Sequence, residues 1–440
     1  MESVKTVVQN ELCCGCGTCK AICPTEAISM KIFETGKLQP EITEKCINCG
    51  KCLKYCPQVT FNYQSMQSEQ FGELCDSPLI GTYRLLVNTY SKDENSLKKS
   101  TSGATVTTLV KKLLQDGSYD SAFMVDTYNY SGIVKSIRYT AESDFENVPK
   151  SRYVQISHEQ DIEYIINNPE ERVIFIGTAC FVHAVLNVIK KNQLKRENYL
   201  LIGLFCDKTM TYHVWDYFDH IFMENSMEKL IFRDKHPAGW PGDVKVFNKA
   251  GEEKDISRKE RMAVKEYFMP ESCLYCMDKL NRFADFSVGD NYTNVARYEK
   301  GSNTLFIRTD RAAEIWKRYE ADFITTLVTE EEVAKSQKLE ARKQNLMYSK
   351  MKNIDTLGFE VEKETITSEG QEKYEELIYK ANVGKSENYD EIYAQILKNR
   401  KKRGLSNMLK QVPQKIVYRI AKYTGILMLY KKLKKSLGKK

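Results

Sequence analysis

The stretch CCGCGTCKAICP, residues 13–24, decides the fold of the first part of this 440-residue chain. Its cysteines follow the spacing C-x2-C-x2-C-x3-C and precede Pro24. The stretch CINCGKCLKYCP, residues 46–57, repeats this spacing and precedes Pro57. Bacterial ferredoxins use such runs to hold a pair of 4Fe–4S clusters. The two stretches therefore predict a two-cluster ferredoxin domain over residues 1–62.

The spacing also predicts which cysteines share a cluster. In two-cluster ferredoxins the fourth cysteine of each run binds the other cluster. One predicted ligand set is therefore Cys13, Cys16, Cys19 and Cys56, and the other is Cys46, Cys49, Cys52 and Cys23. Zinc usually takes C-x2-C pairs across a longer gap, and disulfides need an oxidising compartment, so both alternatives fit the spacing less well. Between the runs, residues 27–32 and 38–42 are expected to form two strands joined by a turn.

Composition indicates a soluble globular protein with 42% hydrophobic and 28% charged residues. We expect no signal peptide and no membrane span, because no run of 18 apolar residues occurs. Fourteen cysteines without an export signal favour the reducing cytoplasm. The net charge of +7 hides an asymmetry, since residues 400–440 contain fourteen Lys and Arg and no acids. The remaining chain therefore carries 7 − 14 = −7.

Hydrophobic periodicity predicts a mixed α+β or α/β fold behind the ferredoxin domain. Residues 63–80 lack strong periodicity and are interpreted as a linker. A second domain is expected over residues 81–325, a helical extension over 326–399 and a basic tail over 400–440. Helices are expected over 105–115, 181–191 and 212–223. Strands are expected over 122–125, 173–176, 199–205, 230–232, 244–247, 285–288 and 305–308.

Six further cysteines do not belong to the spacing of either ferredoxin run. Cys180 and Cys206 each end a predicted strand, where sites collect in α/β sheets, and Cys273 and Cys276 form a C-x2-C pair. These four thiols could bind a third 4Fe–4S cluster or zinc, or Cys180 and Cys206 could be ordinary buried residues. Cys14 and Cys75 are interpreted as incidental.

Six short motifs occur together in an order seen in one family. They are KSTSGA (99–104), SRYVQ (151–155), GTAC (177–180), GLFC (203–206), FRDK (232–235) and the C-x2-C pair followed by DFSVGD (285–290). Through them the chain resembles the beta subunits of coenzyme F-420 hydrogenases and dehydrogenases over about residues 1–310. Those proteins are flavin and iron–sulfur proteins, and many carry a fused N-terminal ferredoxin.

The resemblance implies one FAD and a third cluster on Cys180, Cys206, Cys273 and Cys276. Small residues before a helix can present N–H groups to the FAD pyrophosphate, although a plain helix cap by Ser102 is the alternative. A cation beside the flavin would stabilise its reduced form, although solvated surface charges are the alternative. The cofactor-binding candidates are Ser100, Thr101, Ser102, Gly103, Thr105, Arg152, Tyr153, Lys279, Asn281, Arg282 and Asp290; no catalytic residue is assigned.

Two departures weaken the case for F-420 itself. The family often has Gly-Thr-Pro-Cys-Gln, where this chain has Ala179 and Phe181 around Cys180. Many members have Cys-His-Gly where this chain has Asp207 and Lys208 after Cys206. No G-x-G-x-x-G and no P-loop occurs, so neither NAD nor ATP is supported.

The basic tail combines an apolar stripe with lysines and arginines on other faces. The stripe consists of Leu405, Leu409, Val412, Ile416, Ile420, Tyr423, Leu427 and Tyr430, interrupted at Pro413. This pattern favours an anionic membrane surface at the inner face of the cell membrane, with docking on the protein itself as the alternative and no nucleic acid expected.

The sequence thus predicts a flavin- and iron–sulfur-dependent oxidoreductase. Electrons would pass between FAD and the 4Fe–4S clusters, with reduced F-420, an organic substrate or a redox protein as partner, and surface-polysaccharide biosynthesis as one setting. The alternatives are a non-catalytic iron–sulfur electron-relay subunit of a larger complex and a structural zinc protein.

Overall fold

The computed structural model describes residues 3–72, 77, 79–125, 132–145, 150–236, 239–352 and 367–411, with side chains up to residue 401. The chain divides into two compact units, Met1–Glu387 and Asn388–Lys440. Cys75 and residues 412–440 of the tail lie outside the described part.

The ferredoxin domain is built from short elements around its two cysteine runs. Strands β1 (Ile28–Ile32) and β2 (Leu38–Ile42) pair antiparallel, as the sequence predicts. Its helices are α1 (Lys5–Gln9), α2 (Thr18–Ala21), α3 (Lys51–Tyr55) and α4 (Pro57–Thr60).

A mixed eight-stranded sheet forms the core of the first unit, in the order β13-β3-β12-β11-β7-β6-β4-β5. Strands β4, β6, β7 and β11 are parallel, and the outer strands are antiparallel. The strands are β3 (Leu85–Ser91), β4 (Ser121–Val125), β5 (Ser136–Tyr139), β6 (Val173–Gly177), β7 (Tyr199–Leu204), β11 (Phe286–Asp290), β12 (Asn303–Ile307) and β13 (Phe323–Leu327).

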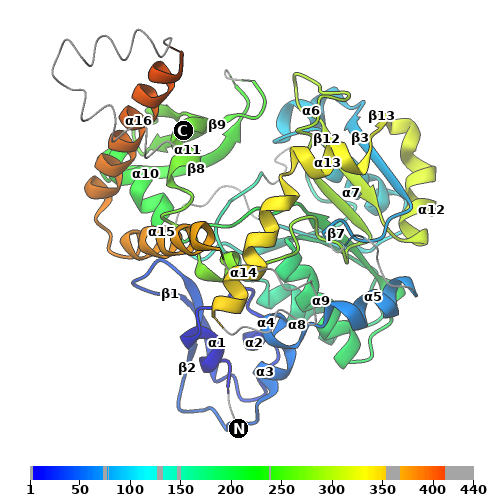
Figure 1. Cartoon of the computed structure of the whole chain (residues 1–440). Coiled ribbons are helices and arrows are strands. Elements are labelled where there is room, and N and C mark those ends of the chain that lie inside the picture. The colour runs from blue at the N-terminus through cyan, green and yellow to red at the C-terminus, as the bar shows by residue number, and fades with distance from the viewer. Residues whose placement is uncertain are drawn as a thin grey trace, which may run out of the picture. The chain divides into compact units, whose positions relative to one another are not determined.

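Helices cover both faces of this sheet (Figure 1). On one face α7 (Thr105–Gln115) and α12 (Asp310–Tyr319) bury Leu109, Leu113 and Trp316 against the strands. On the other face α9 (Ala179–Lys191) follows β6 and packs Phe181 against Phe175, with ring centroids 5.8 Å apart. Successive strand side chains point to opposite faces, so the strands of a sheet covered on both sides are apolar throughout.

A small antiparallel sheet lies beside the large one. It contains β8 (Met227–Asp234), β9 (Asp243–Asn248) and β10 (Glu253–Ile256). The remaining helices are α6 (Glu94–Lys99), α8 (Glu159–Asn167), α10 (His213–Met223), α11 (Arg258–Val264), α13 (Glu330–Ser336), α14 (Lys343–Met351) and α15 (Ser368–Gly384), with 3-10 turns at Arg196–Asn198, Glu271–Leu274, Glu320–Asp322 and Leu339–Arg342.

The first half of the segment interpreted as a linker, residues 63–80, is a packed helix. Helix α5 (Tyr63–Phe71) buries Tyr63, Met66 and Gln67. Just before it, Phe61 stacks on His183 of α9 with ring centroids 3.9 Å apart. The chain that leaves the ferredoxin domain is therefore packed against the sheet domain over residues 61–71. Periodicity missed this helix because its buried face includes a glutamine.

The second unit contains α16 (Tyr389–Gln411), which includes the first residues of the basic tail. The membrane prediction for the tail concerns mainly residues outside the described part and stays a prediction. Within the described residues, no helix combines the length and the apolar composition that a membrane crossing requires.

Candidate functional site

The first ferredoxin ligand set meets at one cavity. Cys13, Cys16, Cys19 and Cys56 line it together with apolar Val4, Val7 and Met30. Three of these cysteines come from the first run and the fourth from the second, which is the crossed arrangement that the spacing predicts. Cys14 lines the cavity as well. Because the four thiols of the predicted set lie on partly apolar walls, this donor set fits a 4Fe–4S cluster.

The second ligand set lies nearer the surface. Cys46, Cys49 and Cys52 are electrostatic neighbours, and Cys49 is exposed. The N–H of Val4 donates to Cys52 Sγ over 3.3 Å, as such N–H groups do to cluster sulfurs. The Sγ of Cys23 accepts from the N–H of Ala27 at 3.3 Å. The membership of Cys23 in this set stays a prediction.

The later cysteines gather at the carboxyl edge of the parallel strands. Cys180 follows β6 and Cys206 follows β7, and Cys273 and Cys276 lie close enough to interact electrostatically with them. Burial raises the pKa of Cys273 to about 11 and that of Cys276 to about 12. Burial therefore disfavours the thiolate form of these residues when no metal is bound. A metal that binds them displaces their protons and compensates the thiolate charge.

Residues of the helical extension hold the loops that carry these cysteines. Arg342 donates to the carbonyl oxygens of Cys276 at 3.3 Å and Cys206 at 3.2 Å. Asn345 donates to the carbonyl of Cys276 at 2.8 Å and to that of Cys273 at 3.4 Å. Sequence reasoning missed both residues because they lie more than sixty positions after Cys276 and follow no motif.

Positive charge surrounds the same edge. Arg342 also pairs with Asp207 Oδ1 at 3.0 Å, and Lys279 lies 3.6 Å from the same atom. Burial acts to raise the pKa of Asp207, but Arg342, Lys279 and Lys208 together lower it to about 2. Lys279 therefore lies beside the Cys206 loop, where it offsets negative charge.

Cys14 connects the two groups of cysteines. Its thiol lies near Cys16 of the first ferredoxin set and near Cys180 of the later set. These neighbouring thiols, together with burial, raise the pKa of Cys14 well above its ordinary value. Cys14 is therefore not an isolated residue, because it lies beside thiols that are far apart along the chain.

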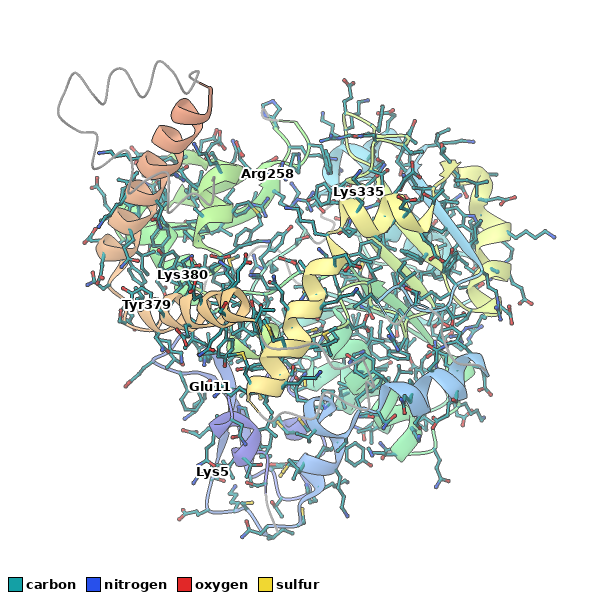
Figure 2. All side chains as sticks on the ribbon, viewed as in Figure 1. Lys5, Glu11, Arg258, Lys335, Tyr379 and Lys380 are labelled. Atoms are coloured by element: carbon teal, nitrogen blue, oxygen red, sulfur yellow. The ribbon has the colours of Figure 1, made fainter. Side chains whose placement is uncertain are left out.

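The ferredoxin domain is fixed to the sheet domain by buried polar contacts. The N–H of Leu38 donates to Gln155 Oε1 at 3.0 Å, and that of His158 donates to the carbonyl of Cys16 at 3.0 Å. Lys37 pairs with Glu271 at 2.5 Å, and both side chains are 5% exposed. Lys37 also pairs with Glu11, which Figure 2 labels on the side of the domain that faces α15.

A separate polar site lies between β8, β11 and the loop before α7. Arg233 binds Asp290 through both terminal nitrogens, at 2.7 and 3.0 Å. It also donates to the phenolic oxygen of Tyr153 at 3.3 Å and to the carbonyl of Thr101 at 3.2 Å. Arg233 was noted only as part of a motif, and its pairing with Asp290 across 57 positions has no local signal.

Cations surround the Tyr153 ring. The Arg261 guanidinium carbon lies 5.2 Å and Lys265 Nζ 5.5 Å from the ring centroid. Burial acts to raise the pKa of Tyr153, but Arg233, Arg261 and Lys265 outweigh it and lower that pKa below its ordinary value. Ala104, Tyr153 and Arg233 all have left-handed backbone conformations, with φ of 58°, 58° and 60°. Strained residues of this kind cluster at functional sites.

The loop predicted to hold a pyrophosphate bonds largely within the protein. Ser100 Oγ donates to the carbonyl of Ser102 at 2.7 Å, and Ser102 Oγ donates to that of Ser302 at 3.0 Å. Thr105 Oγ1 donates to Asn303 Oδ1 at 2.9 Å. A Cβ on Gly103 would lie 2.6 Å from that same Asn303 oxygen. Ser102 does not cap α7, whose N-cap is Ala104.

The other flavin candidates are spread over the molecule. Arg152 is buried with its guanidinium 5.2 Å from the Trp215 ring centroid. Asn281 donates to the carbonyl of Gly177 at 2.9 Å, and the Arg282 guanidinium lies 5.1 Å from the Tyr63 ring centroid. The structure therefore groups Thr101, Tyr153 and Asp290 around Arg233, and it places Asn281 and Arg282 in packed regions beside the sheet.

Within the described residues, no group of three His, Cys, Asp or Glu is arranged around a single metal ion. The four thiolates of a 4Fe–4S cluster bind four different irons, so such a site need not converge on one point.

Comparison with known proteins agrees with this architecture. Residues 170–333 match the family described as the C-terminal region of the beta subunit of coenzyme F-420 hydrogenase/dehydrogenase, and residues 12–60 match a 4Fe–4S dicluster domain. Residues 170–333 are therefore similar to the C-terminal region of those beta subunits. The resemblance drawn from the six motifs is thereby confirmed, and so is the ferredoxin domain drawn from the cysteine runs.

Two curated relatives come from Methanosarcina species. The chain is 25% identical over 315 residues to a subunit of the F(420)H(2) dehydrogenase of Methanosarcina mazei, covering 70% of this chain and 82% of the relative. It is 24% identical over 257 residues to the beta subunit of the coenzyme F-420 hydrogenase of Methanosarcina barkeri, covering 57% and 83%. A solved chain of the F-420-reducing NiFe hydrogenase complex of Methanosarcina barkeri is 21% identical, with a TM-score of 0.48, over 63% of this chain and 94% of that one.

Proposed function

We propose that this chain is an iron–sulfur electron relay that passes single electrons between an internal redox site and a partner protein. The contact through His158 carries the proposal: its N–H donates to the carbonyl of Cys16 at 3.0 Å, and its ring stacks on Phe181, the neighbour of Cys180, with ring centroids 3.5 Å apart. It brings the ligand set of the sheet domain next to the first ligand set of the ferredoxin domain. When bound, 4Fe–4S clusters accept and release single electrons.

The fixed contact between the domains supports a relay. A tethered ferredoxin would have to search for its partner site, whereas Lys37, Gln155 and His158 hold this one in place. Cys180, Cys206, Cys273 and Cys276 would form the internal end of the relay. Cys13, Cys16, Cys19 and Cys56 would form its middle, and the exposed set around Cys49 its outer end. The names of the relatives, both subunits of hydrogenases or dehydrogenases, agree with a place in a larger redox assembly.

Anaerobic reconstitution tests the relay. Three clusters require about twelve iron and twelve sulfide per chain, and reduction should produce their paramagnetic signals. Cys276→Ser should remove about one cluster's iron and leave the two ferredoxin signals. A protein that takes up zinc instead of iron, or that keeps its full iron content after this substitution, would contradict the proposal.

A second candidate function is flavin-dependent hydride transfer at the Arg233 site. This function is favoured by the partly exposed Tyr153, by the bidentate Arg233–Asp290 pair and by the strained residues beside them. Arg233 and Lys235 would hold an anionic cofactor group there, and FAD would supply the exchange between hydride and single electrons. Release of stoichiometric FAD from the purified protein, followed by reductive titration with F-420, NADH and ferredoxin, distinguishes this function from a pure relay.

A further inference from the structure

Three exposed lysines are interspersed with the cysteines of the outer set along residues 45–54. Lys45, Lys51 and Lys54 are exposed, and Glu44 is the only acid between residues 43 and 54. Among the described residues, none of these three lysines has an ion-pair partner, whereas many other lysines of the chain do. We call Lys45, Lys51, Lys54, Ile47 and Cys49 the outer face.

An apolar side chain and a cluster ligand lie within this positive rim. Ile47 is 63% exposed, and Cys49 is the exposed cysteine of its set. Lys5 is also exposed and follows Val4, whose N–H reaches Cys52. Figure 2 labels Lys5 on α1, at the edge of the ferredoxin domain away from the sheet. An apolar centre with a charged rim is the composition of a protein interface rather than of an idle surface.

The positive charge is local. The first 399 residues carry a net charge of −7, yet the segment 43–54 carries three lysines and one glutamate, a net +2. A positive face on a negative body attracts an acidic partner to that face and repels it from the rest of the chain. The ligand set beneath the face is the one that the proposed relay places at its outer end.

We infer that the outer face is the docking site for a small acidic redox protein of the ferredoxin type. This inference rests on the proposed relay and identifies the partner at its outer end. Each transfer moves one electron between the reduced and the oxidised protein, with no bond formed and no proton moved.

Charge reversal on the reconstituted full chain tests the inference. The test variant is Lys45→Glu/Lys51→Glu/Lys54→Glu. The control variant, Lys249→Glu/Lys259→Glu/Lys317→Glu, reverses three exposed lysines outside the ferredoxin domain and changes the net charge equally. The probe is a purified acidic one-cluster ferredoxin, with binding measured by surface plasmon resonance and electron exchange by stopped-flow absorbance.

In the wild type, binding should weaken as salt rises from about 0.05 to 0.5 M, because salt screens charge attraction between the proteins. At low salt the test variant should associate at least about ten-fold more slowly, and its salt dependence should vanish or reverse. The control variant should match the wild type. Reduction of a small viologen dye should be equal in all three proteins, which shows that the clusters are intact.

Other outcomes overturn the inference. One is a test variant that binds and exchanges electrons with the ferredoxin as the wild type does. Another is a variant that loses binding to phosphatidylserine vesicles but keeps ferredoxin exchange, which would make the outer face a lipid-binding surface. If the wild type itself exchanges electrons with neither viologen nor ferredoxin, the proposed relay fails as well, and the viologen measurement separates that failure from a wrong docking site.

Discussion

Gly17 lies where the first cysteine run approaches the sheet domain. Its φ is +77°, and a Cβ built there would lie 2.6 Å from Ser157 Oγ and 3.1 Å from the backbone nitrogen of Glu159. Gly72 has nearly the same φ, +76°, but a Cβ there would meet nothing within 4 Å. Comparing alanine substitutions at the two glycines therefore separates the cost of backbone strain from the cost of a steric clash.

We expect Gly17→Ala to destabilise the reconstituted protein more than Gly72→Ala. Both substitutions place an alanine in a left-handed conformation, at a cost of about 1–2 kcal/mol. Gly17→Ala adds the cost of overpacking at the domain contact, about 1–3 kcal/mol. Denaturant unfolding of the two variants measures the difference. Equal losses of unfolding free energy in the two variants would mean that the domain contact accommodates the added Cβ without cost, contrary to this prediction.

Tyr153 should titrate below the other tyrosines. Because nearby cations favour the phenolate, its folded-state pKa is lower than the ordinary value of 10.0. In the wild type, absorbance near 295 nm should change in a step below the pH at which the other tyrosines titrate. The Tyr153→Phe variant should lack this step. In the Arg261→Met variant, this absorbance change should occur at higher pH than in the wild type, because one cation beside Tyr153 is removed.

The sign of the linked stability follows. A lowered folded-state pKa gives stability that is fully present above the ordinary value of 10.0 and is lost as pH falls through the folded-state pKa. The wild type should therefore gain stability relative to Tyr153→Phe as pH rises toward 10.0. A constant difference between the two proteins over this range would contradict the charge arrangement around Tyr153.

At the residue scale, the sequence indicates which cysteines come together and says little about the residues that contact them. The spacing of the ferredoxin cysteines is a local property, so the cavity shared by the first run and Cys56 was predictable. Arg233 with Asp290 and Arg342 with Cys206 are contacts across 57 and 136 positions. Nothing local in a sequence specifies such a pairing, and Cys14 was dismissed for the same reason.

The turn at Leu339–Arg342 and helix α14 act as a clamp on the later cysteine set. We expect Arg342→Met to reduce the iron of the reconstituted protein by about one cluster and to leave the ferredoxin signals unchanged. The guanidinium is 7% exposed, and removing it leaves three buried carbonyl bonds unmade, at about 1–3 kcal/mol each. Iron analysis and electron paramagnetic resonance measure the loss.

Lys343→Met is the matched control. Lys343 is the next residue along the chain, and its side chain is 45% exposed beside Glu340. Its substitution removes the same charge from a half-exposed side chain that pairs with Glu340, so the iron content should stay at the wild-type value. Equal iron in the two variants would show that the clamp is not needed to hold the metal.

At the element scale, strong periodicity gave accurate predictions. The helix expected over 105–115 is α7 with the same bounds, because its buried leucines and valines recur at helical spacing. The strand β13 was not predicted, and it crosses the expected boundary between the sheet domain and the helical extension; its burial pattern leaves only Phe323 buried. An edge strand exposed on both faces has no alternation of apolar and polar residues from which periodicity could predict it.

The whole molecule differs most from the sequence expectation in how its domains connect. A linker was expected, and the structure has α5 packed beside the stacked pair of Phe61 and His183. The ferredoxin domain and the sheet domain thus form parts of one compact unit. Figure 1 shows the ferredoxin elements beneath α14 and α15. A relay needs this fixed placement, and composition cannot show it because the contacts join distant segments.

The buried pair of Lys37 and Glu271 tests how much the relay depends on that placement. We expect Lys37→Glu to loosen the ferredoxin domain, because it puts a third carboxylate beside Glu11 and Glu271 in a site that is 5% exposed. Breaking a buried ion pair costs about 3–5 kcal/mol. Hydrogen exchange should then rise in residues 36–40 and 155–158 while the sheet strands keep their protection.

Lys31→Glu is the control, since Lys31 is 53% exposed on β1 of the same domain. It changes the charge equally and should leave exchange at the domain contact unchanged. In Lys37→Glu, equilibration of electrons between the sheet domain and the ferredoxin domain after a laser-generated pulse should slow by about ten-fold or more, and in Lys31→Glu it should not. A Lys37→Glu protein with higher exchange at the contact but unchanged equilibration would mean that electrons do not cross at Cys14.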